Sequence, residues 1–212
     1  MQNTIRDEKI LEYLKKHSLF AVSKDFGITQ EHLYSIAKNL FFQDKEFAEY
    51  ILKFFDPLYF WGYKAYVYAH EKNEQEIDDI INLIEIEYYE LHGMIECYVN
   101  ILLEVGISIV EFFPYKSLQI LKSINETYEI LGSTPIETLD LSVDIVCVIA
   151  KDDLEKALEL LDETIEVDYY KYYALKKIDD MYNLENIKKK IDEVSNIIMK
   201  YDKDFLLQEL EK

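Results

Sequence analysis

Residues 56–84 read DPLYFWGYKAYVYAHEKNEQEIDDIINLI, and this stretch contains two recognisable helix starts. Asp56 is a preferred N-cap residue, and Pro57 suits the first helical position, where no backbone N–H is needed. Asn73 stands in a similar way before an acidic first turn. The apolar residues after each cap recur at intervals of three and four, which is typical of helices with an apolar face. The stretch predicts two helices joined as a hairpin.

The same apolar register returns at intervals of 40 residues, which indicates an internal repeat. The corresponding positions are Ile77, Ile81 and Ile84, then Ser117, Leu121 and Ile124, then Ala157, Leu161 and Thr164. The helices that precede these are expected at 58–72, 89–112 and 136–150, and a fourth pair is expected at 168–181 and 184–201. A two-helix hairpin leaves one apolar face uncovered, so neighbouring hairpins must stack. The predicted fold is all-α, with antiparallel helical hairpins stacked as a short right-handed solenoid.

Large, small and aromatic residues stand in these hairpins at the spacing of a known repeat signature. They are Trp61, Ala65, Tyr68, Ile77, Ile81 and Ile84, followed by Leu141, Ile145, Val148, Ala157, Leu161 and Thr164. In this respect the chain resembles the tetratricopeptide repeats over residues 57–201, although its repeat period is longer. The resemblance implies a concave face, formed by the first helix of each hairpin, that holds an extended peptide or a partner helix.

Charge divides the chain near residue 56. The formal net charge is −19, of which residues 1–56 carry −1 and residues 57–212 carry −18. We therefore predict a small N-terminal helical module over 1–56 and an acidic repeat domain over 57–212. The alternative is one continuous helical array. Half of the residues are apolar, and only five Gly and three Pro are present, which disfavours a sheet-rich fold.

Residues 19–42 contain a second recognisable pattern, LFAVSKDFGITQEHLYSIAKNLF at 19–41. Gly27 suits a turn with positive φ, Ile28 is expected in the core and Thr29 is expected to cap the second helix. This pattern resembles a helix-turn-helix. A DNA-reading role would use the residues that the resemblance turns toward a major groove, which are Lys24, Gln30, Tyr34 and Lys38.

Two alternative functions follow from these features. An N-terminal helix-turn-helix before tetratricopeptide-like repeats is similar to the layout of peptide-sensing bacterial transcriptional regulators. The strong negative charge alone would fit an acidic inhibitor that mimics nucleic acid. Arg6 is the only arginine in the chain, which counts against nucleic-acid binding by most of the surface.

Clusters of tyrosine are the candidate protein-binding residues. Fifteen of the eighteen tyrosines lie after residue 56, and exposed Tyr is a good rigid contact residue. The alternative is that these rings pack at the seams between hairpins. The candidates are Tyr59, Tyr63, Tyr66, Tyr169, Tyr170 and Tyr173.

No catalytic motif or metal-ligand spacing can be recognised, so we expect no catalytic residues, no metal and no cofactor. Cys97 and Cys147 are expected as reduced thiols, because each lies within an apolar helical pattern. The first residues lack the apolar segment of a signal peptide, which favours a cytoplasmic location. The expected function is a non-catalytic scaffold or adaptor for another protein or peptide. The acidic surface favours a basic partner, and the chain is compatible with a homodimer.

Overall fold

The computed structural model describes residues 10, 12–13, 27–52, 55–131 and 136–210, and these residues form helices joined by short turns. No strand occurs in these ranges, so the all-α prediction is confirmed. The chain divides into two compact units, Met1–Ser108 and Ile109–Lys212. This division does not coincide with the charge step at residue 56, because α5 (Pro57–His70), which follows that step, packs against α3 (Gln30–Leu40), which precedes it.

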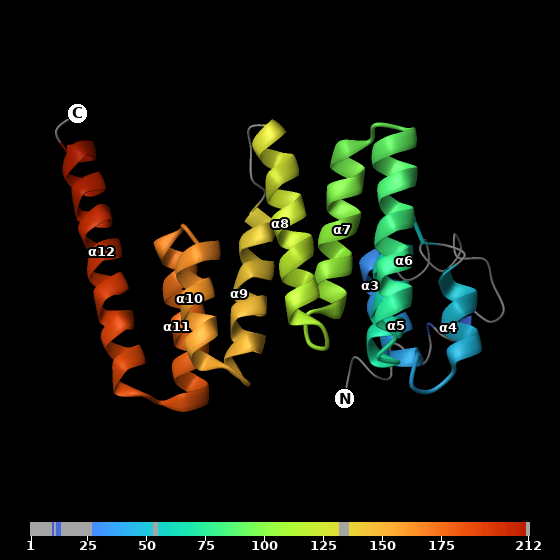
Figure 1. The fold of residues 1–212 in the computed structure, drawn as a ribbon, viewed down its shortest axis with the longest axis horizontal. Coiled ribbons are helices and arrows are strands. Elements are labelled where there is room, and N and C mark those ends of the chain that lie inside the picture. Colours follow the sequence, from blue (N-terminus) through green and yellow to red (C-terminus); the bar gives the residue numbers. More distant parts are fainter. Residues whose placement is uncertain (1–9, 11, 14–26, 53–54, 132–135, 211–212) are drawn as a thin grey trace. The chain divides into compact units, whose positions relative to one another are not determined.

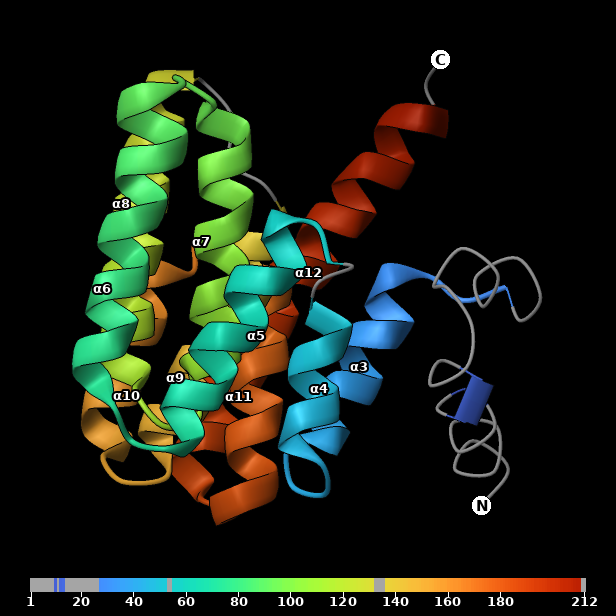
Figure 2. The same ribbon diagram turned by 90° about the vertical axis from the view of Figure 1, so that its right-hand side faces the viewer.

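Unit 1 is built from five α-helices and a π-helix within its described residues. Pairs in contact are α3 with α4, α3 with α5, α5 with α6, and α6 with η1 (Figure 2). The bounds are Gln30–Leu40 for α3, Lys45–Leu52 for α4, Pro57–His70 for α5, Glu74–Ile84 for α6, Glu85–Leu91 for η1 and Ile95–Ile109 for α7.

The core of unit 1 joins α3, α4 and α5. Ile28, Leu33 and Ile36 are buried there, as the helix-turn-helix pattern predicted, together with Ile51 and Tyr63. Gly27 has φ +62°, and the Thr29 side chain accepts a hydrogen bond from the His32 backbone N–H at 3.2 Å. The predicted turn and cap are therefore confirmed, while the expected first helix of the motif, residues 19–26, lies outside the described residues.

The prediction of one long helix over 89–112 is wrong. α6 instead continues as η1 to Leu91, and α7 begins at Ile95. Gly93, between η1 and α7, has φ +61°. Residues with a side chain rarely adopt this conformation, so glycine suits the turn between the two helices. The chain therefore turns at residues 92–94, and the helical segment that contains Ile77, Ile81 and Ile84 extends further than expected.

Unit 2 contains five helices within its described residues (Figure 1). α9 contacts α8, α10 and α11, and α11 also contacts α12. The bounds are Pro114–Leu131 for α8, Ile136–Ala150 for α9, Leu154–Thr164 for α10, Asp168–Tyr182 for α11 and Glu185–Leu210 for α12. The predicted helices at 136–150 and 168–181 thus agree with the structure to within one residue.

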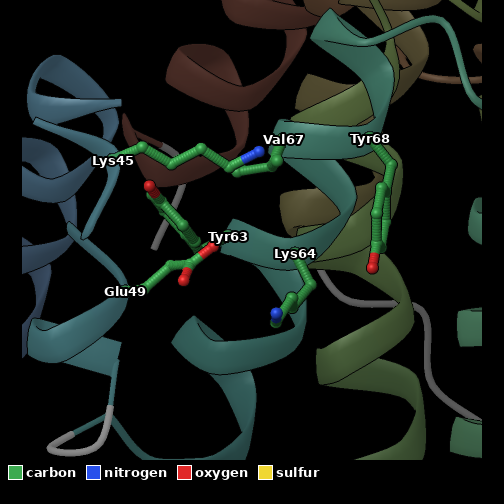
Figure 3. Close-up of a pocket in the computed structure, with 6 residues that line it drawn as sticks. All are labelled: Lys45, Glu49, Tyr63, Lys64, Val67 and Tyr68. Carbon is green, nitrogen blue, oxygen red and sulfur yellow. The ribbon is translucent and has the colours of Figure 1, made fainter. Parts of the chain in front are cut away.

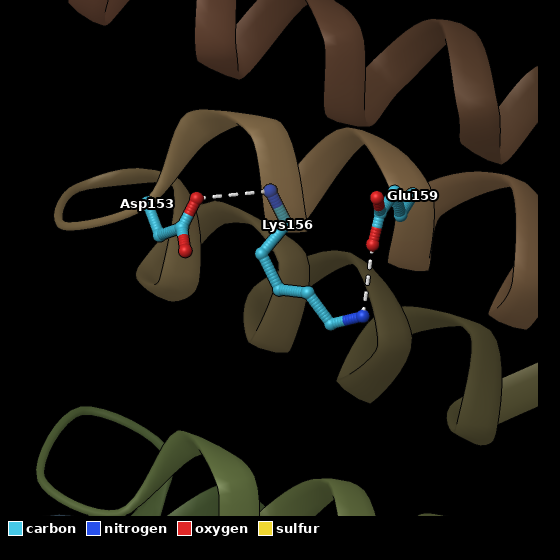
Figure 4. A network of polar contacts seen from close by, with 3 residues as sticks. All are labelled: Asp153, Lys156 and Glu159. Carbon is cyan, nitrogen blue, oxygen red and sulfur yellow. Dashed lines mark hydrogen bonds and ion pairs between the residues drawn. The ribbon is translucent and has the colours of Figure 1, made fainter.

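Local polar groups set several of these helix ends. Asp56 caps α5, as predicted, by accepting from the Tyr59 backbone N–H at 3.2 Å. Asp153 caps α10 by accepting from the Lys156 backbone N–H at 3.0 Å (Figure 4). Asn183, with φ of +51°, is the left-handed residue that ends α11.

Candidate functional site

The tyrosines of α5 lie mainly inside unit 1. Tyr63 is 1% exposed and belongs to the core, which corrects the expectation that it lies on a binding surface. Tyr59 and Tyr66 are partly buried and pack against the same core. The physical reason is that α5 contacts α3 and α6, so little of its circumference remains open. The burial of these rings supports the alternative that the tyrosines of α5 pack between helices.

The tyrosines of α11 lie mainly at the surface of unit 2. Tyr169 is 67% exposed and Tyr173 is 47% exposed, while Tyr170 is partly buried and its ring contacts that of Tyr169. The Lys177 ammonium lies 4.8 Å from the centre of the Tyr173 ring and 3.3 Å from Asp144 Oδ1. Two of the three candidates in this cluster are therefore accessible to a partner.

Side chains of α3 that were candidates for DNA contact are engaged within unit 1. Tyr34 is 7% exposed, and the Lys38 ammonium lies 4.1 Å from the Tyr34 ring centre and 5.1 Å from that of Tyr66. Gln30 Oε1 accepts a hydrogen bond from the Asp56 backbone N–H at 2.9 Å. Burial lowers the pKa of the Lys38 ammonium, although the charge of Glu104 opposes this shift. Lys24 lies outside the described residues.

A polar contact fixes α3 and α5 against α7 inside unit 1. Tyr34 Oη and Ser108 Oγ lie 2.8 Å apart, and the Ser108 hydroxyl also points to Glu104 Oε1 at 3.4 Å. A Cβ at Gly62 would stand 2.5 Å from Glu104 Cγ and 2.8 Å from Tyr34 Oη, so only glycine fits there. Burial and the Glu104 charge raise the pKa of Tyr34 well above its ordinary value. These buried contacts stabilise the packing of the three helices and do not form a binding site.

A cavity of about 80 Å³ lies between α4 and α5 (Figure 3). The Tyr63 hydroxyl, on its wall, is buried and has no hydrogen-bond partner among the described residues. Lys45 also lines the cavity, and its ammonium pairs with Glu71 Oε1 at 2.6 Å. This volume suits ordered water and is well below the size of ordinary ligand pockets, so we do not assign a ligand to it.

An exposed apolar surface lies at the end of the α6–η1 rod, and sequence reasoning missed it. Its large apolar side chains are between 39% and 67% exposed. We call it the α6–η1 surface, and it consists of Leu83, Ile86, Tyr89, Leu91 and Met94. Isolated exposed apolar residues are normal, whereas large apolar patches typically mark binding sites, so five exposed apolar side chains within twelve positions make this segment a candidate.

Carboxylates alternate in the sequence with the apolar residues of the α6–η1 surface. Glu85, Glu87, Glu90 and Glu96 are all exposed. The sequence contains no lysine or arginine from residue 73 to residue 115, whereas ten aspartates and glutamates lie in that range. This absence of basic residues is the signal that would have drawn attention to the surface. Exposed carboxylates and exposed apolar side chains therefore lie along the same segment, which has no basic residue of its own.

The π-helix gives this surface a local structural origin. Its seven residues continue α6 with a wider hydrogen-bonding pattern, and none of them is buried. π-helical turns are rare and occur frequently at functional sites. The His92 ring then lies at the turn, with Nδ1 2.5 Å from the Glu87 carbonyl oxygen. The apolar and acidic side chains of this π-helix are therefore not buried by neighbouring helices.

Metal-binding and thiol chemistry find little support in the described parts of the chain. Within those parts, no group of three or more His, Cys, Asp or Glu side chains is arranged to hold a metal ion. Cys97 and Cys147 are free and partly buried. Burial raises the pKa of Cys97 and raises that of Cys147 to about 11, which disfavours the reactive thiolate.

Comparisons with protein families, with curated proteins and with solved structures find no match to this chain. Among the helices that the structure describes, none is both long enough and apolar enough to cross a membrane.

Proposed function

We propose that this chain is a non-catalytic protein-binding scaffold that holds a basic amphipathic helix on its α6–η1 surface. The observation that carries the proposal is the set of exposed apolar side chains at 83–94, which alternate with carboxylates in a stretch without lysine or arginine from residue 73 to residue 115. An amphipathic helix can bury its apolar side chains against such a surface, while its basic residues pair with the neighbouring carboxylates.

We further propose that the helices form a tetratricopeptide-like solenoid in a reducing, cytoplasmic setting. The contacts of α9 with the helix before it and with the two after it support stacked hairpins. The unpaired state of Cys97 and Cys147 supports the reducing compartment. In this proposal the exposed tyrosines of α11, Tyr169 and Tyr173, add a second contact region for the partner.

The alternative of a DNA-binding regulator receives less support than a protein partner. The exposed residues of α3 are Glu31, Ser35 and Asn39, which offer a carboxylate and two neutral groups to a phosphate backbone. Lys38, the cation of this helix, lies against two aromatic rings. Phosphate neutralisation requires several accessible cations, so this helix is poorly suited to DNA.

Titration of the full chain with a fluorescent 20-residue helical peptide of leucine and lysine tests the proposal. Leu91→Ser with Met94→Ser removes two apolar contacts, and we expect binding about tenfold weaker or more. The matched control is Met199→Ser with Leu184→Ser, which changes exposed apolar residues of unit 2 and should leave the affinity unchanged.

A second pair of variants tests the role of charge. Glu90→Gln with Glu96→Gln should weaken peptide binding and reduce its salt dependence, whereas Glu185→Gln with Glu193→Gln should have a much smaller effect. A peptide of leucine and glutamate should not bind. Equal losses in both pairs of carboxylate variants would show that only the overall charge attracts the peptide, and the proposed surface would be rejected.

A further inference from the structure

A groove of about 470 Å³ in unit 2 is bordered by α8, α9 and α10. Apolar side chains, Leu121, Leu139 and Val167, alternate in its lining with polar ones. The polar members are Lys122, Asn125, Glu129, Thr138, Ser142, Glu163, Thr164 and Glu166. The volume lies within the range of small-molecule sites, which are usually concave and mostly apolar with a few polar groups.

The charged side chains of this groove are mainly acidic. Glu129, Glu163 and Glu166 face a single cation, Lys122, and all four are exposed. None of the ion pairs found in the described parts of the chain involves these four residues. The charge of Glu163 also acts on Lys156 across solvent, and the excess of carboxylates in the groove favours a cationic ligand.

The uncharged polar groups of the groove also favour a hydrogen-bond donor. The Asn125 side-chain oxygen is buried and has no hydrogen-bond partner within the described residues. The hydroxyls of Ser142 and Thr164 donate to the backbone carbonyls of Thr138 and Leu160, at 2.8 Å and 2.7 Å. The lone pairs of these hydroxyl oxygens are left as acceptors. A buried acceptor without a donor is unfavourable, and a ligand N–H group would satisfy the Asn125 oxygen once the side chains that cover it move aside.

We propose that this groove binds an alkylammonium ligand of the aliphatic polyamine class. Its ammonium groups would lie against Glu129, Glu163 and Glu166 and donate to Asn125, and its methylene groups would lie on Leu121 and Leu139. An inorganic cation would satisfy the carboxylates but gain nothing from the apolar lining. The same chemistry could be supplied by a free polyamine or by lysine side chains of a peptide. This site is independent of the α6–η1 surface.

Calorimetric titration of the full chain with spermidine tests the site. Glu129→Gln with Glu163→Gln should weaken binding at least about tenfold, as expected for the loss of two charge contacts. The matched control is Glu126→Gln with Glu155→Gln, which removes exposed carboxylates from the same two helices outside the groove. Asn125→Leu keeps the side-chain volume and removes the acceptor, and it should also weaken binding while the circular dichroism spectrum stays helical.

Parallel titrations with magnesium chloride and with an acetylated alanine–lysine peptide identify the source of the ligand. Spermidine binding that exceeds magnesium binding assigns the groove to free polyamines. Binding of the peptide alone assigns it to lysine side chains of a protein. Equal affinity for spermidine and magnesium, equal losses in the groove and control variants, or no binding of either amine would overturn the proposal.

Discussion

The tyrosine clusters of α5 and α11 look alike in the sequence but differ in the structure. Tyr63 of α5 is in the core, whereas Tyr169 and Tyr173 of α11 are exposed. Lys64 is the only lysine within α5, while α11 contains charged residues throughout its length. The environment of a tyrosine is therefore determined by how many sides of its helix are covered, and the charges between the tyrosines indicate which sides stay open.

The largest difference between the clusters is expected when a ring is removed. Tyr63→Ala should lower the free energy of unfolding by about 3–5 kcal/mol, because it empties a core position. Tyr169→Ala should change it by less than about 0.5 kcal/mol, because most of that side chain is already in water. Urea unfolding followed by circular dichroism measures both values, and similar losses for the two variants would contradict the assigned burial.

A smaller difference is expected between two buried hydroxyls of unit 1. Tyr34→Phe removes the hydrogen bond with Ser108 and should cost about 1–2 kcal/mol. Tyr63→Phe should be neutral or slightly stabilising, since its hydroxyl has no partner in the described residues. Urea unfolding at pH 7 compares the two variants; a larger cost for Tyr63→Phe than for Tyr34→Phe would reverse the assignment.

Alkaline pH should act on the buried tyrosines of α3 and α5. Burial raises the pKa of Tyr34 and Tyr63 above the ordinary value of 10.0. The unfolded chain therefore loses these protons at lower pH than the folded chain. The stability that they contribute is complete below pH 10 and decreases above it, by about 1.4 kcal/mol per pH unit for each tyrosine. Unfolding between pH 9 and 11 should show a shallower decrease in Tyr63→Phe, and an unchanged slope would count against the shift.

The smallest effects are expected at the N-termini of the two helices. Asp56 caps α5, whereas Val167 precedes α11 without a side-chain cap. Asp56→Ala should cost about 1 kcal/mol, and Val167→Ser should gain a few tenths of a kcal/mol or more. Thermal unfolding of the two variants and of the unmodified chain measures the change in stability at each helix N-terminus. A stabilising Asp56→Ala would mean that the cap seen at Tyr59 is not maintained in solution.

Local features of the fold could be predicted because their causes are local. Asp56 with Pro57, Gly27 and Thr29 each occupy the backbone position that their chemistry favours. The π-helix could not be predicted, because its apolar residues also fit an ordinary helix. The charge step at residue 56 did not indicate the division into units, since charge describes the surface while packing of α3 on α5 determines the unit.

The candidate site was harder to predict than the fold. Tyr63 was proposed as a contact residue because an aromatic residue in a helical pattern does not reveal whether another helix covers it. The α6–η1 surface was missed because apolar residues such as Leu91 and Met94 read as core until their neighbours are known. Only the lack of lysine and arginine between residues 73 and 115 marked this region in advance.

Hydrogen exchange of the full chain, with and without the leucine–lysine peptide, tests the central claim most directly. We predict that the peptide slows exchange of backbone amides at 83–97 and leaves those at 185–201 unchanged, because a bound helix excludes water from the α6–η1 surface. Slower exchange confined to 185–201, or no change at 83–97 when the peptide is saturating, would contradict the proposed binding surface.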